Sequence, residues 1–124
     1  MKKINTENAP AAIGPYSQAI EHNGLVYSSG QIPIDPQTGT ICGDTIAEQT
    51  HQVMKNLSAV LAAAGSSMDK ILKTTCFIAD MADFVVFNEI YSAYITNAPA
   101  RSCVAVKTLP KNVLVEVDAI AAAD

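Results

Sequence analysis

Apolar residues repeat at helical spacing over two long stretches of the chain. The first stretch runs from Ile46 to Ala64. Thr45 followed by Glu48 resembles a capping box at its start, and Gly65 stands where a helix-ending glycine belongs. We therefore expect an amphipathic helix whose apolar stripe is formed by Ile46, Val53, Met54, Leu57, Val60, Leu61 and Ala64.

The second helical stretch runs from Met81 to Ile95. Asp80 and Asp83 lie at its start, where the helix dipole favours anions, and Pro99 prevents a helix from continuing beyond it. We expect a second amphipathic helix here, with an apolar side formed by Phe84, Phe87, Ile90, Tyr91, Tyr94 and Ile95.

Short runs rich in apolar and β-branched residues predict five strands. The first two flank the Asn23-Gly24 pair, which favours a tight hairpin turn. The last two flank the segment from Leu109 to Asn112, which we interpret as a second hairpin turn. The predicted strands are Ala19 to Glu21, Leu25 to Ser28, Ile71 to Ile78, Ser102 to Lys107 and Val113 to Ala121.

This order of elements predicts a single α+β domain over residues 1–124, with two helices packed on one face of one sheet. The last strand is apolar on both sides, with Val115 and Val117 on one side and Leu114 and Ile120 on the other. Because two helices can cover only one face, we expect a neighbouring subunit to cover the other.

Composition and charge narrow the classes of function. Hydrophobic residues make up 49% of the chain and charged residues 16%, which favours self-association in so small a protein. The net charge of -4 and the scattered lysines make nucleic acid an unexpected partner. The longest apolar run, Val60 to Ala64, is far shorter than the ~20 residues of a membrane span. With no signal-peptide pattern at the N-terminus, we expect a cytoplasmic protein.

The residues that commonly bind metals lack the usual spacing. Cys42, Cys76 and Cys103 form no CxxC pair, and His22 and His51 offer no ligand pattern. We expect reduced thiols and no structural metal.

Arg101 is the only arginine, and it follows Pro99-Ala100 directly into a predicted strand. A guanidinium can bind a substrate carboxylate through two parallel hydrogen bonds. The alternative is a structural ion pair at the end of a strand. Cys103 points to the same side of this strand, but no histidine stands at a pairing position, so we interpret it as pocket lining and not as a nucleophile.

Glu116 and Asp118 lie on the same side of the last strand as the apolar Leu114 and Ile120. At least one carboxylate there is therefore expected to be paired or functional. If the last two strands form a hairpin, Arg101 lies within cross-strand reach of Glu116. Glu116 would then be a general base that activates water beside a substrate bound to Arg101. A simple salt bridge between the two side chains is the alternative.

Several separate motifs occur in order along nearly the whole chain. They are Asn8-Ala9-Pro10, Gly14-Pro15-Tyr16-Ser17-Gln18-Ala19, Ser29-Gly30-Gln31-Ile32-Pro33, Lys73-Thr74-Thr75-Cys76-Phe77-Ile78, Pro99-Ala100-Arg101-Ser102, and Leu109-Pro110 followed by Val115-Glu116-Val117-Asp118-Ala119. Together they resemble the RidA family of reactive-imine deaminases, also described as YjgF-like proteins.

The resemblance implies a chorismate-mutase-like fold and a homotrimer, with sheets packed inward and active sites between subunits. It also implies hydrolysis of 2-imino acids, such as 2-iminobutanoate and 2-iminopropanoate, to 2-oxo acids and ammonia without a metal or cofactor. Small 2-imino or 2-oxo acids are the implied ligands.

The same resemblance implies roles for individual residues. Arg101 would bind the substrate carboxylate together with the Gly30 backbone, and Glu116 would position the attacking water. The remaining implied pocket residues are Tyr16, Ser29, Asn88 and Cys103. Many relatives have an aromatic residue directly before the Pro-Ala-Arg motif, where this chain has Ala98, so the resemblance does not fix the substrate preference.

Other functions match parts of the pattern. A chorismate mutase would be expected to recruit more than one arginine for its dicarboxylate, and this chain has only Arg101. Family members have also been linked to non-catalytic binding of small carboxylates, to chaperone-like roles, and to RNA cleavage or inhibition of translation. The presence of both Arg101 and Glu116 favours the deaminase, and the acidic charge disfavours an activity on RNA.

Overall fold

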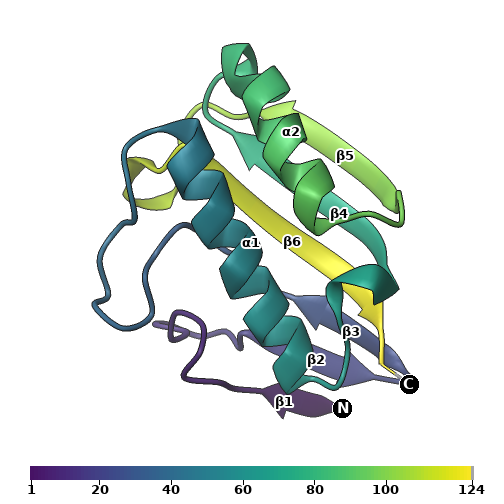
Figure 1. Cartoon of the computed structure of the whole chain (residues 1–124). Helices are drawn as coiled ribbons and strands as arrows, with labels where there is room; N and C mark the ends of the chain where they lie inside the picture. Colours follow the sequence, from purple (N-terminus) through teal and green to yellow (C-terminus); the bar gives the residue numbers. More distant parts are fainter. Residues whose placement is uncertain (124) are drawn as a thin grey trace.

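The computed structural model describes residues 1–123 as one mixed sheet of six strands with two α-helices on one face (Figure 1). The strands are β1 (Lys2–Ile4), β2 (Ala19–His22), β3 (Leu25–Ser28), β4 (Ile71–Ile78), β5 (Ala100–Ala105) and β6 (Val115–Ala122). Their order across the sheet is β1-β2-β3-β6-β4-β5, and only β4 and β5 pair in parallel. The predicted α+β class with one sheet is confirmed.

The first predicted helix is α1 (Ile46–Ala63), and its ends form as expected. The Thr45 hydroxyl accepts the Glu48 N–H at 3.2 Å and donates to the Glu48 carboxylate at 2.8 Å. At the other end Gly65 has a φ of +77°, and Ser66 N–H donates to the Leu61 carbonyl at 2.9 Å. These caps fix where the helix enters and leaves the sheet surface.

The second predicted helix begins later than expected. Residues Met81–Asp83 form a short 3-10 turn, and α2 spans Phe84–Tyr94. Asp80 caps the turn because its carboxylate accepts the Ala82 N–H at 2.9 Å. In the described part of the chain, neither α-helix combines the length and apolar character needed to cross a membrane.

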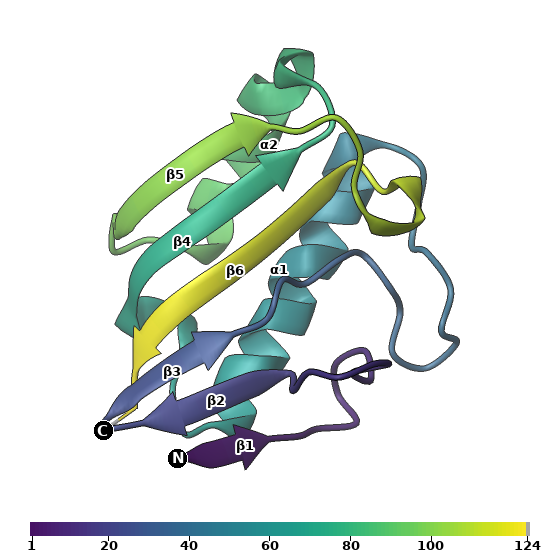
Figure 2. The same cartoon turned by 180° about the vertical axis from the view of Figure 1, so that it is seen from behind.

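The core lies between the helices and one face of the sheet (Figure 1). Val115 and Val117 of β6 are fully buried against it, whereas Glu116 and Asp118 alternate with them and point to the other face. Figure 2 shows that no helix covers this other face. The core is completed by α1, β4 and α2, and its fully buried side chains include Val53, Met54, Leu57, Val60, Leu61, Ile71, Cys76, Ile78 and Phe87.

The predicted second hairpin is wrong. β4 lies between β5 and β6 and pairs with both, so the segment from Leu109 to Asn112 connects strands that are not neighbours. The reason is burial. In β4, buried residues alternate with partly exposed ones, and the strand lies inside the sheet, whereas most residues of β5 are exposed and this strand forms an edge. β1, where the residue pattern predicts no strand, pairs with β2 at the other edge.

Candidate active site

Arg101 lies on the edge strand β5 and turns toward α2. Its Nη1 donates to Asn88 Oδ1 at 2.7 Å, and its guanidinium carbon lies 4.9 Å from the centre of the Tyr91 ring and 5.6 Å from that of Phe84. These three α2 residues share one helix face because they are spaced four and three residues apart. One face of α2 therefore orients the guanidinium with an amide and two aromatic rings.

The neighbours of Arg101 leave its charge available. Asn88, Tyr91 and Phe84 are neutral side chains, so within residues 1–123 these contacts position the cation without forming an ion pair. The Tyr91 hydroxyl is hydrogen-bonded to Thr74 Oγ1 at 2.7 Å, which fixes the ring. Burial raises the pKa of Tyr91. The structural ion pair considered for Arg101 is not what these described residues form.

A hollow of about 620 Å³ lies beside Arg101 and is lined in part by Asn88, Tyr91 and Ala98. Ala98 has a φ of +51°, a left-handed backbone conformation that is uncommon for a residue with a β-carbon. Cys103 packs against the core on the same face as Arg101. Burial raises the pKa of its thiol although Arg101 opposes this, which suits pocket lining better than nucleophilic attack.

Glu116 lies on the other face of the sheet, in close contact with Gly30. A β-carbon added at Gly30 would lie 1.9 Å from Glu116 Oε2, so any other residue here would displace the carboxylate from this position. Backbone hydrogen bonds between Gln31 and Val117, at 2.8 and 3.1 Å, hold the Gly30 segment along β6. The tight contact fixes where the Glu116 carboxylate can lie.

Ser29 and Tyr16 lie on the chain segments around Gly30. The Ser29 hydroxyl donates to the Ser17 carbonyl at 2.6 Å, and the Ser29 N–H donates to the Gln18 carbonyl at 2.9 Å. These bonds tie the Tyr16 segment to the Gly30 segment. The structure thus brings Tyr16, Ser29, Gly30 and Glu116 to one place and Asn88, Arg101 and Cys103 to another.

The Glu116 carboxyl is electrostatically unusual. Burial and, to a smaller extent, the nearby Asp118 raise its pKa. Burial also raises the pKa of Asp118, although Lys73 and hydrogen bonds from Thr75 oppose this. A carboxyl whose pKa is raised toward neutrality is a better proton acceptor than an ordinary glutamate once it has lost its own proton.

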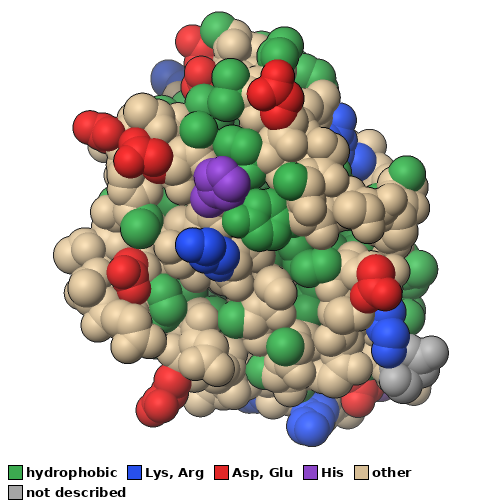
Figure 3. Space-filling model, in the orientation of Figure 1, with side chains coloured by type: hydrophobic (Ala, Val, Ile, Leu, Met, Phe, Trp, Pro, Cys, Tyr) green, Lys and Arg blue, Asp and Glu red, His purple; other side chains and the backbone are tan. Residues whose placement is uncertain are grey.

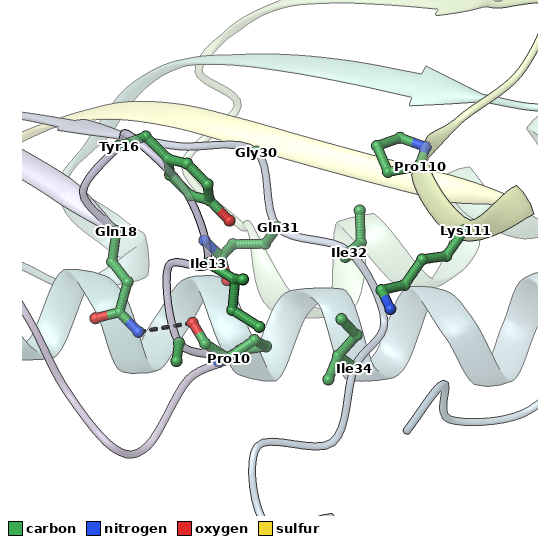
Figure 4. Close-up of a pocket in the computed structure, with 11 residues that line it drawn as sticks. Pro10, Ile13, Tyr16, Gln18, Gly30, Gln31, Ile32, Ile34, Pro110 and Lys111 are labelled. Atoms are coloured by element: carbon green, nitrogen blue, oxygen red, sulfur yellow. Dashed lines mark hydrogen bonds between the residues drawn. The ribbon is translucent and has the colours of Figure 1, made fainter. Parts of the chain in front are cut away.

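A second cavity, of about 290 Å³, opens next to Gly30 (Figure 4). Ile13, Ile32 and Ile34 contribute apolar walls, and Tyr16 lies at one end. Lys111 reaches in from the turn Pro110–Asn112. Sequence reasoning did not single out Lys111, because a lysine in a polar turn carries no signal that it faces a cavity.

Gln18 supports this region. It is buried, with 2% of its surface exposed, and its amide donates to the Pro10 carbonyl at 2.7 Å and accepts the Thr6 N–H at 2.7 Å. A buried glutamine with backbone partners indicates a side chain that organises a loop.

The predicted closeness of Arg101 and Glu116 within one chain is wrong. In the strand register, Arg101 pairs with Thr74 of β4, and Thr74 pairs with Ala119 of β6. Ala119 is three residues from Glu116 along the same strand. Two strand spacings and three residues along a strand separate the two backbone positions by roughly 14 Å. Their side chains also point to opposite faces, Arg101 toward α2 and Glu116 away from the helices. The salt bridge between them is therefore excluded within a chain.

The described residues contain no group of three or more His, Cys, Asp or Glu side chains arranged to hold a metal ion. What the site does contain is a cation on one face and a carboxylate of raised pKa on the other. These two groups can bind a small anion and move a proton, respectively.

Comparison with known proteins identifies the relatives of this chain. The model of the family described as "Endoribonuclease L-PSP" matches residues 6–123. A Salmonella typhimurium protein named 2-iminobutanoate/2-iminopropanoate deaminase is 49% identical over 124 residues, covering 97% of this chain and 96% of its own. A Lactococcus lactis protein that carries the name of a regulator, AldR, is 56% identical over 122 residues, covering 98% and 97%.

A solved structure gives the same result. Escherichia coli TdcF, crystallised with bound serine, superposes with a TM-score of 0.95 at 42% identity and covers 100% of both chains. The matches extend over the whole sheet and both helices, and the relatives include proteins named as imine deaminases. The chain therefore belongs to the RidA or YjgF-like family, whose family model bears the description endoribonuclease L-PSP.

Proposed function

We propose that this protein hydrolyses small 2-imino acids to 2-oxo acids and ammonia, with 2-iminobutanoate and 2-iminopropanoate as substrates. The proposal rests on two side chains, Arg101 and Glu116. Arg101 is positioned by neutral partners and can bind a carboxylate, and Glu116 has a raised pKa and can accept a proton. Relatives about 49% identical carry the name of this activity.

In the proposed reaction, Arg101 and the Gly30 N–H bind the substrate carboxylate. Glu116 takes a proton from a water molecule while the water oxygen forms a bond to the imine carbon. This proton passes to the imine nitrogen and gives an amino alcohol. Glu116 then moves the hydroxyl proton of this intermediate to the amino nitrogen, the C–N bond breaks, and ammonia leaves as the C=O bond forms. The imine carbon is already electrophilic, so binding and two proton transfers through Glu116 supply most of what is needed.

The active site in this proposal lies between two chains. Arg101 and Glu116 point to opposite faces of one sheet, so the Arg101 of one chain has to meet the Glu116 of a neighbour. The sheet face that no helix covers bears half-buried carboxyls and the apolar Ile120. This composition fits a surface that a second copy of the chain covers. A closed ring of three chains, as the resemblance implies, would place one such site at each interface.

In this arrangement Tyr16, Ser29 and Gly30 line the Glu116 side of the pocket. Asn88 and Cys103 line the Arg101 side. We place the protein in the cytoplasm and expect no metal or cofactor, because neither step of the proposed reaction requires one.

Cleavage of RNA is the activity that the family description names. The net charge of -4 disfavours it, because binding a polyanion depends on clustered cations. On the helix-bearing face, Lys and Arg side chains are separated by neutral and acidic ones (Figure 3). We therefore favour the deaminase.

The test follows trapping of the imine by semicarbazide. A dehydratase acting on serine releases 2-aminoacrylate, the enamine form of 2-iminopropanoate, and the rate of semicarbazone formation is recorded. Wild-type protein should suppress trapping, Arg101→Ala should not, and Lys107→Ala, which removes the same charge from an exposed position, should behave as wild type. Equal trapping with and without the wild-type protein would rule out the proposed activity.

A further inference from the structure

The cavity beside Gly30 has one polar feature that the proposed reaction does not use. Among the 11 described residues that line it, Lys111 is the only charged side chain. Aliphatic groups, including Ile13, Ile32 and Ile34, form much of the remaining wall. The cavity is thus largely apolar, with Gly30 among its lining residues and Lys111 as its single cation.

The two amide side chains of the cavity are already hydrogen-bonded. Gln18 donates to the Pro10 carbonyl at 2.7 Å, and Gln31 donates to the Ser29 carbonyl at 3.3 Å. Within residues 1–123 the Lys111 ammonium and the Tyr16 hydroxyl have no hydrogen-bond partner, and both side chains are exposed to solvent. An apolar wall next to an unpartnered cation disfavours a second cation and favours a ligand that is apolar along its length and anionic at its end.

The turn directs Lys111 into this position. Lys111 and Asn112 both have a positive φ, of 56° and 55°, and Asn112 N–H donates to the Leu109 carbonyl at 3.0 Å. Figure 4 shows the Lys111 side chain extended from the turn, with its nitrogen on the side of Ile32 and Ile34 and with Tyr16 at the far end. The ammonium is therefore at the end of the cavity away from Tyr16.

The cavity and the Glu116 carboxylate share Gly30 as a neighbour. A substrate whose carboxylate contacts the Gly30 backbone can direct its side chain into this cavity. The volume of about 290 Å³ is close to the lower end of small-molecule pockets, roughly 300 Å³, and exceeds what a methyl or ethyl group fills.

We propose that this cavity is the subsite for the substrate side chain and that Lys111 is a specificity residue that selects side chains ending in a carboxylate. The preferred substrates are then 2-imino dicarboxylates with two methylene groups between the imine carbon and the distal carboxylate, such as 2-iminopentanedioate. This inference rests on the proposed function, because it assigns the side chain of the same substrate.

The test compares two imines of equal chain length, 2-iminopentanedioate and 2-iminopentanoate, each released in place by an amino-acid oxidase and trapped by semicarbazide. For the wild type, kcat/KM should favour the dicarboxylate. Lys111→Met keeps the length of the side chain and removes the charge, so it should lower this preference about tenfold or more, chiefly by lowering kcat/KM for the dicarboxylate. Lys111→Arg should retain the preference, and Lys107→Met, which changes the net charge equally, should have no effect. An unchanged preference in Lys111→Met would overturn the inference.

Binding separates this inference from the proposed reaction. Calorimetry with the stable analogues 2-oxopentanedioate and 2-oxopentanoate requires no turnover. If no imine is hydrolysed by the wild type, the proposed function fails, and a tenfold weaker binding of 2-oxopentanedioate by Lys111→Met still supports the subsite. Equal binding of this ligand by the wild type and Lys111→Met would refute it.

Discussion

The two halves of the candidate site are built in opposite ways. The Arg101 half is exposed, lies on an edge strand, and is positioned by neutral groups from α2. The Glu116 half lies on β6, near the middle of the sheet, and is confined by the Gly30 backbone, with a carboxyl whose pKa burial raises. One half is suited to receive an anion from outside, and the other to hold a proton acceptor in a fixed place. In the proposed reaction, binding and chemistry are thus divided between the two faces of the sheet.

Removing the proton acceptor should have the largest effect. Glu116→Gln keeps the shape of the side chain and should lower kcat by about 10²–10⁴-fold, with KM less affected. Measurement of kcat and KM by imine trapping tests this. A variant with more than a third of the wild-type kcat would contradict the role of Glu116.

The same substitution has a predicted dependence on pH. The raised pKa of Glu116 means that the folded protein binds this proton more tightly than the unfolded chain. The stability that this proton contributes is complete below the unfolded pKa and is lost as pH rises through the folded pKa. Glu116→Gln should therefore melt at a higher temperature than wild type near pH 7.5, and the difference should shrink toward pH 4. Wild-type activity should fall as the pH drops through the raised pKa.

Mixing two inactive variants tests whether the halves come from different chains. Co-expressed Arg101→Ala and Glu116→Gln chains should form mixed assemblies in which about one quarter of the interfaces combine an intact Arg101 with an intact Glu116. Specific activity should rise from near zero to about a quarter of that of the wild type. Mixing Arg101→Ala with the double variant is the control and should restore nothing. Failure of the first mixture to exceed its parents would place both groups of a working site in one chain.

The Gly30 contact predicts a loss of activity without a loss of fold. In Gly30→Ala the new methyl group would meet Glu116 Oε2, the mobile end of a side chain, so the carboxylate has to shift while the backbone does not. A shift of about 1 Å in a catalytic group can lower activity about 10²-fold. We expect a loss of that order in kcat/KM with a melting temperature close to that of the wild type. Full activity, or an unfolded protein, would each contradict the contact as described.

The smallest expected effect comes from giving Arg101 a charged neighbour. Asn88→Asp would place a carboxylate 2.7 Å from the guanidinium, where it competes with the substrate. KM should rise about tenfold, which corresponds to about 1.4 kcal/mol. Asn88→Ala, which removes the hydrogen bond without adding charge, should raise KM less. If the two variants have the same KM, the charge of this neighbour is unimportant.

Local features of the fold were well predicted from the sequence because they depend on neighbouring residues. The Asn23-Gly24 turn has a positive φ at both residues and joins β2 to β3 as expected, and Thr45 caps α1 as expected. The neighbour of β5 could not be predicted in this way. The Leu109–Asn112 segment has the turn residues of a hairpin, but turn chemistry does not reveal that the more apolar β4 inserts between the flanking strands.

The candidate site, too, was predicted where it depends on local sequence and mispredicted where it depends on strand order. The resemblance supplied the residue types of both halves, and the alternation of the last strand correctly separated Glu116 and Asp118 from Val115 and Val117, although the pattern did not indicate which of the two sides the helices cover. The mistaken strand pairing then put Arg101 beside Glu116 in one chain. Phe84, Tyr91 and Lys111 were not assigned to the site, because the apolar pattern of a helix and the polar composition of a turn do not distinguish core or surface residues from those that contact a site.

The placement of Arg101 and Glu116 on opposite faces has a consequence for inheritance. In a cell that makes equal amounts of an intact chain and a chain lacking both residues, each shared site needs an intact contribution from two chains. About one quarter of the sites would then work, in place of the half expected for independent subunits. A defective copy of the gene would interfere with the normal one, so such alleles should behave as partially dominant.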